Sequence, residues 1–394
     1  MCDVIDDALS RVPESSRRRF LQGVGASAVL TGLSVTAGAA ASAAAVGGGR
    51  SAERFRTKVV LLGTGGGPTI LSAERVGVST AVVYGDAVYL VDLGLGSQMQ
   101  LTKAGLAPDG FGGRAYTTVR GILFTHMHTD HVAEWPAVYT TGMMNRVGAP
   151  AEPIRVFGPG ARGTLPRVFP PNRPEPAIVN PADPTPGIAG MTGYLDQAFA
   201  ADLNDRIRDS GAPGPAPFFD VADLDISALW QVDPEGIPPR VSPFPVWQDG
   251  DVNITATLVD HRPTAPAFAY RFDTPDGSVV VSGDTRPSEN LIELAQGADV
   301  LVHEVIDPVF ADQLAELVGG QAGAALREHL LASHTTIEQV GRDVAEAAGA
   351  RTLVLSHIAP SNADVKNLRA AQRGFSGELV IGEDLMQLGV GTRG

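Results

Sequence analysis

The sequence predicts an α/β fold, namely a four-layer αββα sandwich in which two β-sheets pack face to face and helices cover their outer sides. Three observations support this. Short apolar segments rich in β-branched residues alternate with helix-like segments. They form two sets, separated by a Pro-rich stretch at 150–250. With 394 residues, the chain is long enough to bury such a layered core.

The first set of elements lies before residue 150. Thr57–Leu62 (TKVVLL) is typical of a buried strand and runs into a Gly-rich segment. Ser79–Tyr84 and Ala87–Asp92 alternate in polarity, which predicts a hairpin closed at Gly85-Asp86. Further predicted elements are a helix over Gly96–Gly105, a strand over Val119–Phe124 and a helix over Val132–Met144.

The middle of the chain has a different composition. Most prolines fall between Pro150 and Gly250, and one helix-like segment, Tyr194–Asp209, interrupts them. We interpret 150–250 as an inserted lid with ordered loops, because its aromatic side chains provide apolar surface for docking. These aromatics are Phe218, Phe219, Trp230, Phe244 and Trp247.

The second set of elements follows residue 250. The predicted strands are Val252–Val259, Ala267–Phe272, Ser278–Ser282, Asp299–Val302, Thr352–Leu355 and Glu378–Ile381. The predicted helices are Glu289–Gln296, Ala311–Val318 and Thr336–Ala348. We therefore expect residues 51–394 to form one domain that carries the lid.

Residues 1–46 have the pattern of an export signal. Ser16-Arg17-Arg18-Arg19-Phe20-Leu21 precedes a weakly apolar stretch, and small residues at 41–45 suit cleavage. This resembles a twin-arginine signal, so we expect a periplasmic or extracellular protein. No stable membrane anchor is expected, because a span needs roughly 20 strongly apolar residues. Cys2, the one cysteine, lies in this segment, so a metal site in the mature chain must use histidines and carboxylates.

The net charge bears on the class of partner. The chain carries a formal charge of −14 with a pI near 5.0. Proteins that grip nucleic acid through phosphates usually show a basic surface, so this charge favours a small-molecule substrate over a nucleic acid.

The segment ILFTHMHTDHVAEW, at 122–135, concentrates metal-ligand side chains behind an apolar strand. Alternate residues of an extended segment point the same way, so His126 and His128 can meet at one cation. Asp130 and His131 can face a second centre as the chain turns into a helix. Imidazole and carboxylate groups suit Zn²⁺, and a catalytic zinc keeps one position open for water.

THMHTDH resembles the signature of the metallo-β-lactamase superfamily. The resemblance covers roughly 57–145 and 252–385, and is closest to the branch with ribonuclease Z and certain arylsulfatases and phosphodiesterases. It implies two Zn²⁺ ions, although other divalent metals suit the same groups. The implied ligands are His126, His128 and His261 for one ion, Asp130, His131 and His357 for the other, and Asp284 as the bridge. Asp92 in VDLGLG is implied to orient the metal loop without binding metal.

The resemblance also implies a proton donor. Glu304 in VLVHEV and His334 in SHTTIEQV match a pair in which the carboxylate holds an imidazole that protonates the leaving oxygen. The predicted catalytic residues are thus Asp130, Glu304 and His334. His303 is expected to pack or hydrogen-bond, His329 to be an ordinary surface residue, and Gly65–Gly67 to form a tight turn.

These features favour an exported dinuclear zinc hydrolase that cleaves a small phosphodiester or an aryl sulfate ester with an activated hydroxide. A ribonuclease Z-like endonuclease that processes tRNA 3′ ends is an alternative. True ribonuclease Z holds transfer RNA with a projecting arm, whereas 150–250 here contains no lysine and more carboxylates than arginines. VDLGLG also differs from the DCGEG common in that family.

Three further functions stay open on the same ligands. One is hydrolysis of a lactone, an ester or a β-lactam, for which His334→Ala should matter little if no alkoxide must be protonated. The second is an iron-dependent oxygenase or diiron redox protein. The third is a non-catalytic metal binder. Family resemblance also implies a homodimer.

Overall fold

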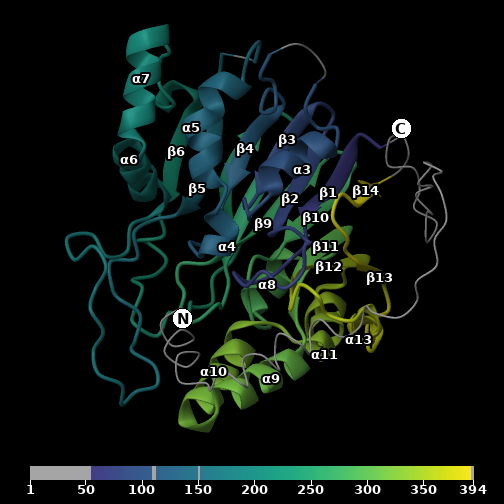
Figure 1. The fold of residues 1–394 in the computed structure, drawn as a ribbon. Helices are drawn as coiled ribbons and strands as arrows, with labels where there is room; N and C mark the ends of the chain where they lie inside the picture. Colours follow the sequence, from purple (N-terminus) through teal and green to yellow (C-terminus); the bar gives the residue numbers. More distant parts are fainter. Residues whose placement is uncertain (1–54, 109–111, 150, 392–394) are drawn as a thin grey trace, which may run out of the picture.

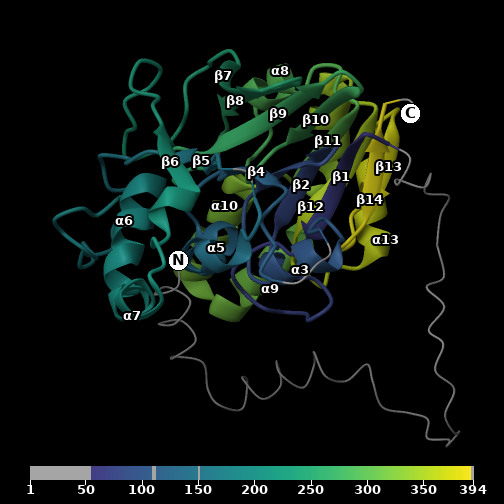
Figure 2. The ribbon, with the colours of Figure 1, turned by 90° about the horizontal axis from the view of Figure 1, so that it is seen from above.

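The computed structural model describes residues 55–108, 112–149 and 151–391. The predicted export signal at 1–46 lies outside these ranges, so it stays a prediction. The described chain forms two seven-stranded sheets packed face to face with helices outside each, and the predicted αββα sandwich is confirmed. Figure 2 shows the layers in order, from α8 through the two sheets to α3 and α5.

The first sheet has the strand order β14-β1-β2-β3-β4-β5-β6. Its strands are β1 (Thr57–Gly63), β2 (Ser79–Tyr84), β3 (Ala87–Val91), β4 (Val119–Leu123), β5 (Ile154–Pro159), β6 (Phe219–Leu224) and β14 (Gln387–Val390). Pairing is antiparallel from β14 to β3 and parallel from β3 to β6.

The second sheet has the order β13-β12-β11-β10-β9-β8-β7. Its strands are β7 (Phe244–Asp249), β8 (Val252–Leu258), β9 (Phe268–Thr274), β10 (Gly277–Val281), β11 (Val300–Ile306), β12 (Thr352–Ala359) and β13 (Glu378–Ile381). Strands β10 to β13 are parallel, and β7 to β10 are antiparallel. Strand β8 is antiparallel to β9 and so runs in the same direction as β10, β11 and β12.

Helices cover both outer faces (Figure 1). Those next to the first sheet are α3 (Ser97–Lys103), α4 (Thr129–Val132), α5 (Trp135–Asn145), α6 (Ile188–Ala198) and α7 (Ala200–Ser210). Those associated with the second sheet are α8 (Glu289–Leu294), α9 (Pro308–Val318), α10 (Gly320–Ser333), α11 (Ile337–Gln339), α12 (Glu346–Ala348) and α13 (Val365–Leu368). A π-helical segment, Val340–Ala345, joins α11 to α12.

Alternation along the strands divides the core into layers. On β1, Val59 and Leu61 pack between the two sheets, whereas Val60 and Leu62 pack against the outer helices. This is the two-residue period of a strand that is buried on both sides. Trp135 of α5 is fully buried in the outer layer of the first sheet.

The lid is smaller than the predicted range 150–250. Strands β5 and β6 belong to the first sheet and β7 to the second, so the part outside the sheets consists mainly of the loops at 160–187, 211–218 and 225–243 together with α6 and α7. The many prolines of this segment, two of which lie within β5 and β7, led to its interpretation as loops. Pro159 ends β5, and Pro245 lies at a register shift in the edge strand β7, where a missing N–H breaks no ladder bond.

Other differences concern helix boundaries. The helix predicted over Val132–Met144 is two helices, because Pro136 occupies the first turn of α5 and could not lie in a helix interior. The helix predicted over Tyr194–Asp209 is divided into α6 and α7 at Phe199. Helix α10 and strand β14 were not predicted. No helix in the described ranges has both the length and the apolarity to cross a membrane.

The two sheets are joined by a polar contact at one edge. Asp249 of β7 accepts hydrogen bonds from Tyr89 Oη at 2.8 Å and from Arg120 Nε and Nη2 at 3.1 Å each. Burial raises the pKa of Asp249, but the bonds from Arg120 and Tyr89 outweigh burial and lower it below its usual value.

We therefore expect Asp249→Asn to lower the free energy of unfolding by about 1 kcal/mol at pH 7. A carboxylate with a lowered folded-state pKa stabilises above its unfolded pKa, about 3.9, and loses that effect as the pH falls through the folded value. The difference from wild type should thus be smaller at pH 3 than at pH 7 in urea denaturation. Asp220→Asn, on an exposed ion pair with Arg155, is the matched control.

Candidate metal centre

The candidate ligands lie where several strands of both sheets end. His126 and His128 follow β4, His261 follows β8, Asp284 follows β10, and His357 lies near the end of β12. Strands that run in the same direction bring their carboxyl ends to the same edge, which is how residues far apart in sequence meet. The structure brings together all seven predicted ligands in two groups that share Asp284.

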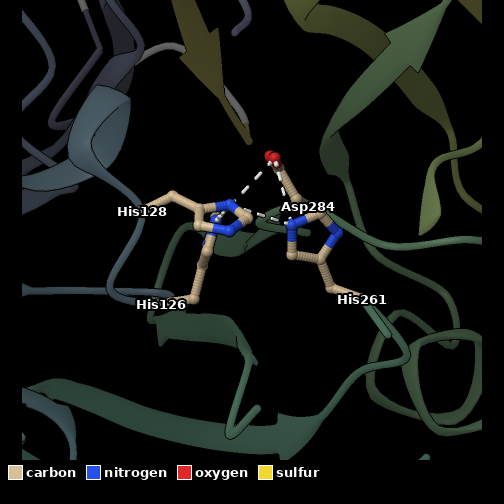
Figure 3. Close-up of side chains that lie close together, drawn as sticks. All are labelled: His126, His128, His261 and Asp284. Atoms are coloured by element: carbon tan, nitrogen blue, oxygen red, sulfur yellow. Dashed lines mark hydrogen bonds and ion pairs between the residues drawn. The ribbon is translucent and has the colours of Figure 1, made fainter. Parts of the chain in front are cut away.

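The first group comprises His126, His128, His261 and Asp284 (Figure 3). His128 Nδ1 lies 3.0 Å from His126 Nε2 and 3.2 Å from His261 Nε2. Asp284 Oδ2 lies 3.9 Å from His126 Nε2 and 3.8 Å from His261 Nε2. The four groups therefore converge on one small volume.

The second group comprises Asp130, His131, Asp284 and His357. Asp284 Oδ1 lies 3.3 Å from Nε2 of His131 and 3.3 Å from Nε2 of His357. Asp130 Oδ2 lies 3.4 Å from His357 Nε2 and 3.7 Å from His131 Nε2. Each Asp284 oxygen thus faces a different group, as a bridging carboxylate must.

These distances fit a bound divalent cation. Nitrogens at about 2.0–2.1 Å from a tetrahedral zinc are about 3.3 Å apart, close to the separations in both groups. His131 Nε2 and Asp284 Oδ1 are buried and make no hydrogen bond within the described residues, a state that metal coordination would resolve. The residues fit two divalent ions. Imidazole and carboxylate ligands suit zinc, manganese and iron alike, so they do not select one of these metals.

Asp92, which was predicted to orient the segment 126–131 that carries four ligands, hydrogen-bonds to two residues of that region. It lies at the end of β3 with a positive φ of 60°. Its Oδ1 accepts from Thr125 N at 2.8 Å, and its Oδ2 lies 2.8 Å from His131 Nδ1 and accepts from Thr125 Oγ1. Holding Nδ1–H of His131 leaves Nε2 free to bind metal, which is the orienting role expected of such a carboxylate.

A β-bulge aims His357 at the site. Ser356 and His357 oppose Glu304 across the β11–β12 ladder, and His357 has a φ of 41°. Gly67 N points at His357 Nε2 from 3.3 Å, and a Cβ on Gly66 would lie 2.7 Å from His357 Nδ1. The Gly-rich segment lies close against His357, and Gly65 and Gly66 donate hydrogen bonds to Val76 O and Ile358 O, so the structure has bridging contacts here in place of the predicted tight turn.

Charge is distributed unevenly across the two groups. Burial lowers the pKa of His126 and His261 well below the usual value, and that of His128 to about 4. Burial also opposes protonation of His131 and His357, but Asp284 and the neighbouring carboxylates outweigh it and raise both pKa values. Protonation is thus favoured in the second group relative to the first, and a cation that binds there would compete with protons.

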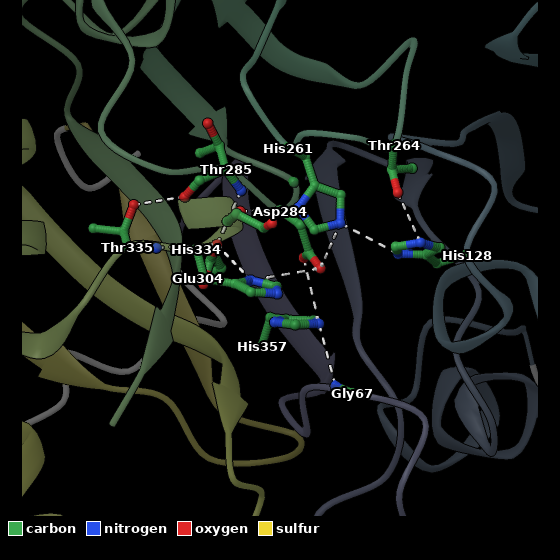
Figure 4. Close-up of polar contacts among 12 residues, drawn as sticks. Gly67, His128, His261, Thr264, Asp284, Thr285, Glu304, His334, Thr335 and His357 are labelled. Carbon is green, nitrogen blue, oxygen red and sulfur yellow. Dashed lines mark hydrogen bonds and ion pairs between the residues drawn. The ribbon is translucent and has the colours of Figure 1, made fainter. Parts of the chain in front are cut away.

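Glu304 and His334 form a buried pair beside the ligands (Figure 4). His334 Nδ1 donates to Glu304 Oε1 at 2.9 Å, and Thr285 N donates to the same oxygen at 2.9 Å. Burial lowers the pKa of His334, but Glu304 and Asp284 outweigh it and raise the pKa to about 9. With Nδ1–H held by Glu304, the Nε2 edge of His334 is the one left to carry a second proton.

The remaining histidines lie outside the two four-residue groups. His303 is fully buried on β11 with its Nδ1 2.7 Å from Glu304 O, so it packs and hydrogen-bonds, as expected. His329 on α10 is half-buried, so its predicted surface position was wrong. Glu304, His334 and His357 also lie close enough to form a third candidate ligand group, which the sequence analysis did not consider.

Comparisons with known proteins agree with this geometry. The family model of the metallo-β-lactamase superfamily matches residues 73–326. A ribonuclease Z of Mycobacterium sp. (strain KMS) is 30% identical over 340 residues, covering 84% of this chain and 96% of the relative. A ribonuclease Z of Mycobacterium bovis (strain BCG / Pasteur 1173P2) is 28% identical over 339 residues, covering 85% and 99%.

Solved structures share the fold. The metallo-β-lactamase fold protein YhfI from Bacillus subtilis has a TM-score of 0.51 at 19% identity, covering 84% of this chain and 98% of that one. The short form of human tRNase Z has a TM-score of 0.51 at 18% identity, covering 85% and 100%. Signature, ligand geometry and similarity over most of the chain agree, and the chain belongs to the metallo-β-lactamase superfamily, with ribonuclease Z among its homologues.

Proposed function

We propose that the chain is a dinuclear metal-dependent phosphodiesterase that cleaves RNA in the manner of ribonuclease Z. The observation that supports it most is the arrangement of two four-ligand groups around Asp284 with the Glu304–His334 pair beside them. Two divalent cations would lower the pKa of water and offset charge on a phosphoryl group. The relatives that match along nearly their whole length are ribonucleases Z.

The chain's own residues then have separate tasks. Asp284 and Asp130 would hold the cations through carboxylate oxygens, with Asp284 shared by the two ligand groups, and would supply negative charge to offset that of the ions. Glu304 holds His334 by its Nδ1–H, so that the opposite nitrogen can deliver a proton to the leaving oxygen. An alkoxide is a poor leaving group without that proton.

The second candidate function is hydrolysis of a small phosphodiester or aryl sulfate ester. Exposed carboxylates on α7, at Asp205 and Asp209, would repel an RNA backbone, whereas Asp202 on the same helix is paired with Arg206. Export, predicted from residues 1–46, would also separate the enzyme from cellular RNA, and fractionation of cells that produce the full chain would locate it.

One substrate panel distinguishes the two functions. The mature chain, loaded with two equivalents of Zn²⁺ or Mn²⁺, is incubated with a tRNA precursor carrying a 3′ trailer, bis-p-nitrophenyl phosphate and an aryl sulfate. We expect cleavage of the RNA at a single position and hydrolysis of the phosphodiester, both lost with a chelator and restored by metal. Cleavage of the small esters alone supports the second candidate. No turnover of any phosphodiester by the metal-loaded protein contradicts both phosphodiester proposals.

A further inference from the structure

The loop between β8 and β9 connects the first ligand group to the lid. It runs from Val259 to Ala267 and contains His261 and Thr264. Of the four residues in the first group, His128 is the one that is not fully buried. The orientation of the His128 ring therefore depends more on specific contacts than that of the fully buried ligands, because less packing surrounds it.

Thr264 makes such a contact (Figure 4). Its Oγ1 lies 2.9 Å from His128 Nε2. The other ring nitrogen, Nδ1, faces His126 and His261 and is the ligand atom. A ligand nitrogen must be unprotonated, so Nε2 carries the hydrogen and donates it to the Thr264 hydroxyl. The contact thus fixes both the tautomer and the rotation of the ring.

The loop around Thr264 is itself held in place. Thr264 N donates to His261 O at 3.0 Å, so the two residues form a small bridge. Ser333 Oγ donates to Arg262 O at 2.5 Å, and Ser333 O lies 2.9 Å from His261 Nδ1. The hydroxyl of Thr264 therefore has a defined position relative to His261.

Arg162, in the lid, holds the same loop from the opposite side. Its Nη1 donates to Pro263 O, and its Nη2 donates to Asp233 O at 2.7 Å and Pro234 O at 3.2 Å. These acceptors are backbone carbonyls of two other loops, so the guanidinium fixes backbone positions. Gly236 lies against Pro263 as well, where a Cβ would approach Pro263 O to 2.5 Å.

We propose that Thr264 is a positioning residue for His128, and that Arg162 links the lid loops at 160–187 and 225–243 to the first metal group. The affinity of that group for metal then depends on the conformation of the lid. The proposal rests on the dinuclear centre of the proposed function, but not on which ester is cleaved. Hydrogen-bond partners of ligating histidines typically change metal affinity by about 10–100-fold when they are removed.

Metal binding without substrate tests the proposal. The metal-free full chain and its variants are titrated with Zn²⁺ by calorimetry and with Co²⁺ by visible absorbance, so that two binding steps are resolved. For Thr264→Val we expect one step to weaken about 10–100-fold and the other to stay within about twofold. Thr264→Ser should bind as wild type, because it keeps the hydroxyl. Arg162→Met should weaken the same step by a smaller factor.

Two variants serve as matched controls. Thr118→Val removes a half-buried hydroxyl that donates to Leu106 O and belongs to neither ligand group. Arg167→Met removes a lid arginine that pairs with Glu235 rather than with the ligand loop. Both control variants should bind metal in two steps with the affinities of the wild type. The proposal is overturned if Thr264→Val binds metal in both steps with wild-type affinity, or if the affinities of both steps fall by the same factor. Because no substrate is present, either result is independent of the substrate panel.

Discussion

Asp284→Asn is expected to abolish hydrolysis and to reduce the bound metal from two equivalents per chain to about one. Each carboxylate oxygen of Asp284 faces a different ligand group, and its Oδ1 lies 3.3 Å from both His131 and His357. Asparagine offers one oxygen and no charge, so it cannot neutralise two cations. Loss of the bridged pair should remove about 4 kcal/mol of transition-state stabilisation, or roughly 10³-fold in kcat/KM.

Elemental analysis and steady-state kinetics on the purified variant measure these effects. Circular dichroism should stay that of the wild type, since the variant keeps the size of the side chain. Asp220→Asn, which also removes an aspartate charge but lies on the outer strand β6, should keep both metals and full activity. Two tightly bound metals with near-normal turnover in Asp284→Asn would rule out the bridging role.

His334→Ala should slow turnover by about 10²–10⁴-fold on RNA or any substrate that leaves as an alkoxide. It should slow bis-p-nitrophenyl phosphate much less, because p-nitrophenolate leaves without a proton. The reason is the position of His334, whose Nδ1 is held 2.9 Å from buried Glu304 while its ring lies 5.0 Å from that of His261. The dependence on the leaving group is the result that a merely structural histidine would not produce.

The amount of bound metal distinguishes a proton-donating His334 from a metal-binding His334. His334, Glu304 and His357 could also hold an ion, and removal of a ligand would lower the bound metal. We expect His334→Ala to keep two equivalents. If His334→Ala slows turnover of both substrates equally and binds one equivalent of metal fewer, His334 is a metal ligand instead. His329→Ala, on the same helix–loop segment but outside every candidate ligand group, is the control.

Much of the fold follows from local pattern. The continuous run of apolar, β-branched residues at β1 predicts a strand, because a strand that is buried on both faces needs apolar side chains at successive positions. The pattern of apolar residues mispredicts helix and strand boundaries where prolines constrain the backbone. Pro136 begins a new helix inside an apolar run, and Pro245 lies in an edge strand that composition suggested was loop. Strand β14 is too short to show a period by itself, and it exists because β1 offers it a free edge.

Residue types and spacing predict the ligand chemistry and the first cluster, since His126, His128, Asp130 and His131 lie within six positions at a strand end. Resemblance to a family also indicated Asp92, Glu304 and His334. The packing of the sheets shows further that Asp284 presents one oxygen to each group, that a bulge turns His357 inward, and that Thr264 and Arg162 connect the lid to His128. The physical reason is that ligand chemistry resides in side chains, whereas the distances between them depend on how two sheets pack.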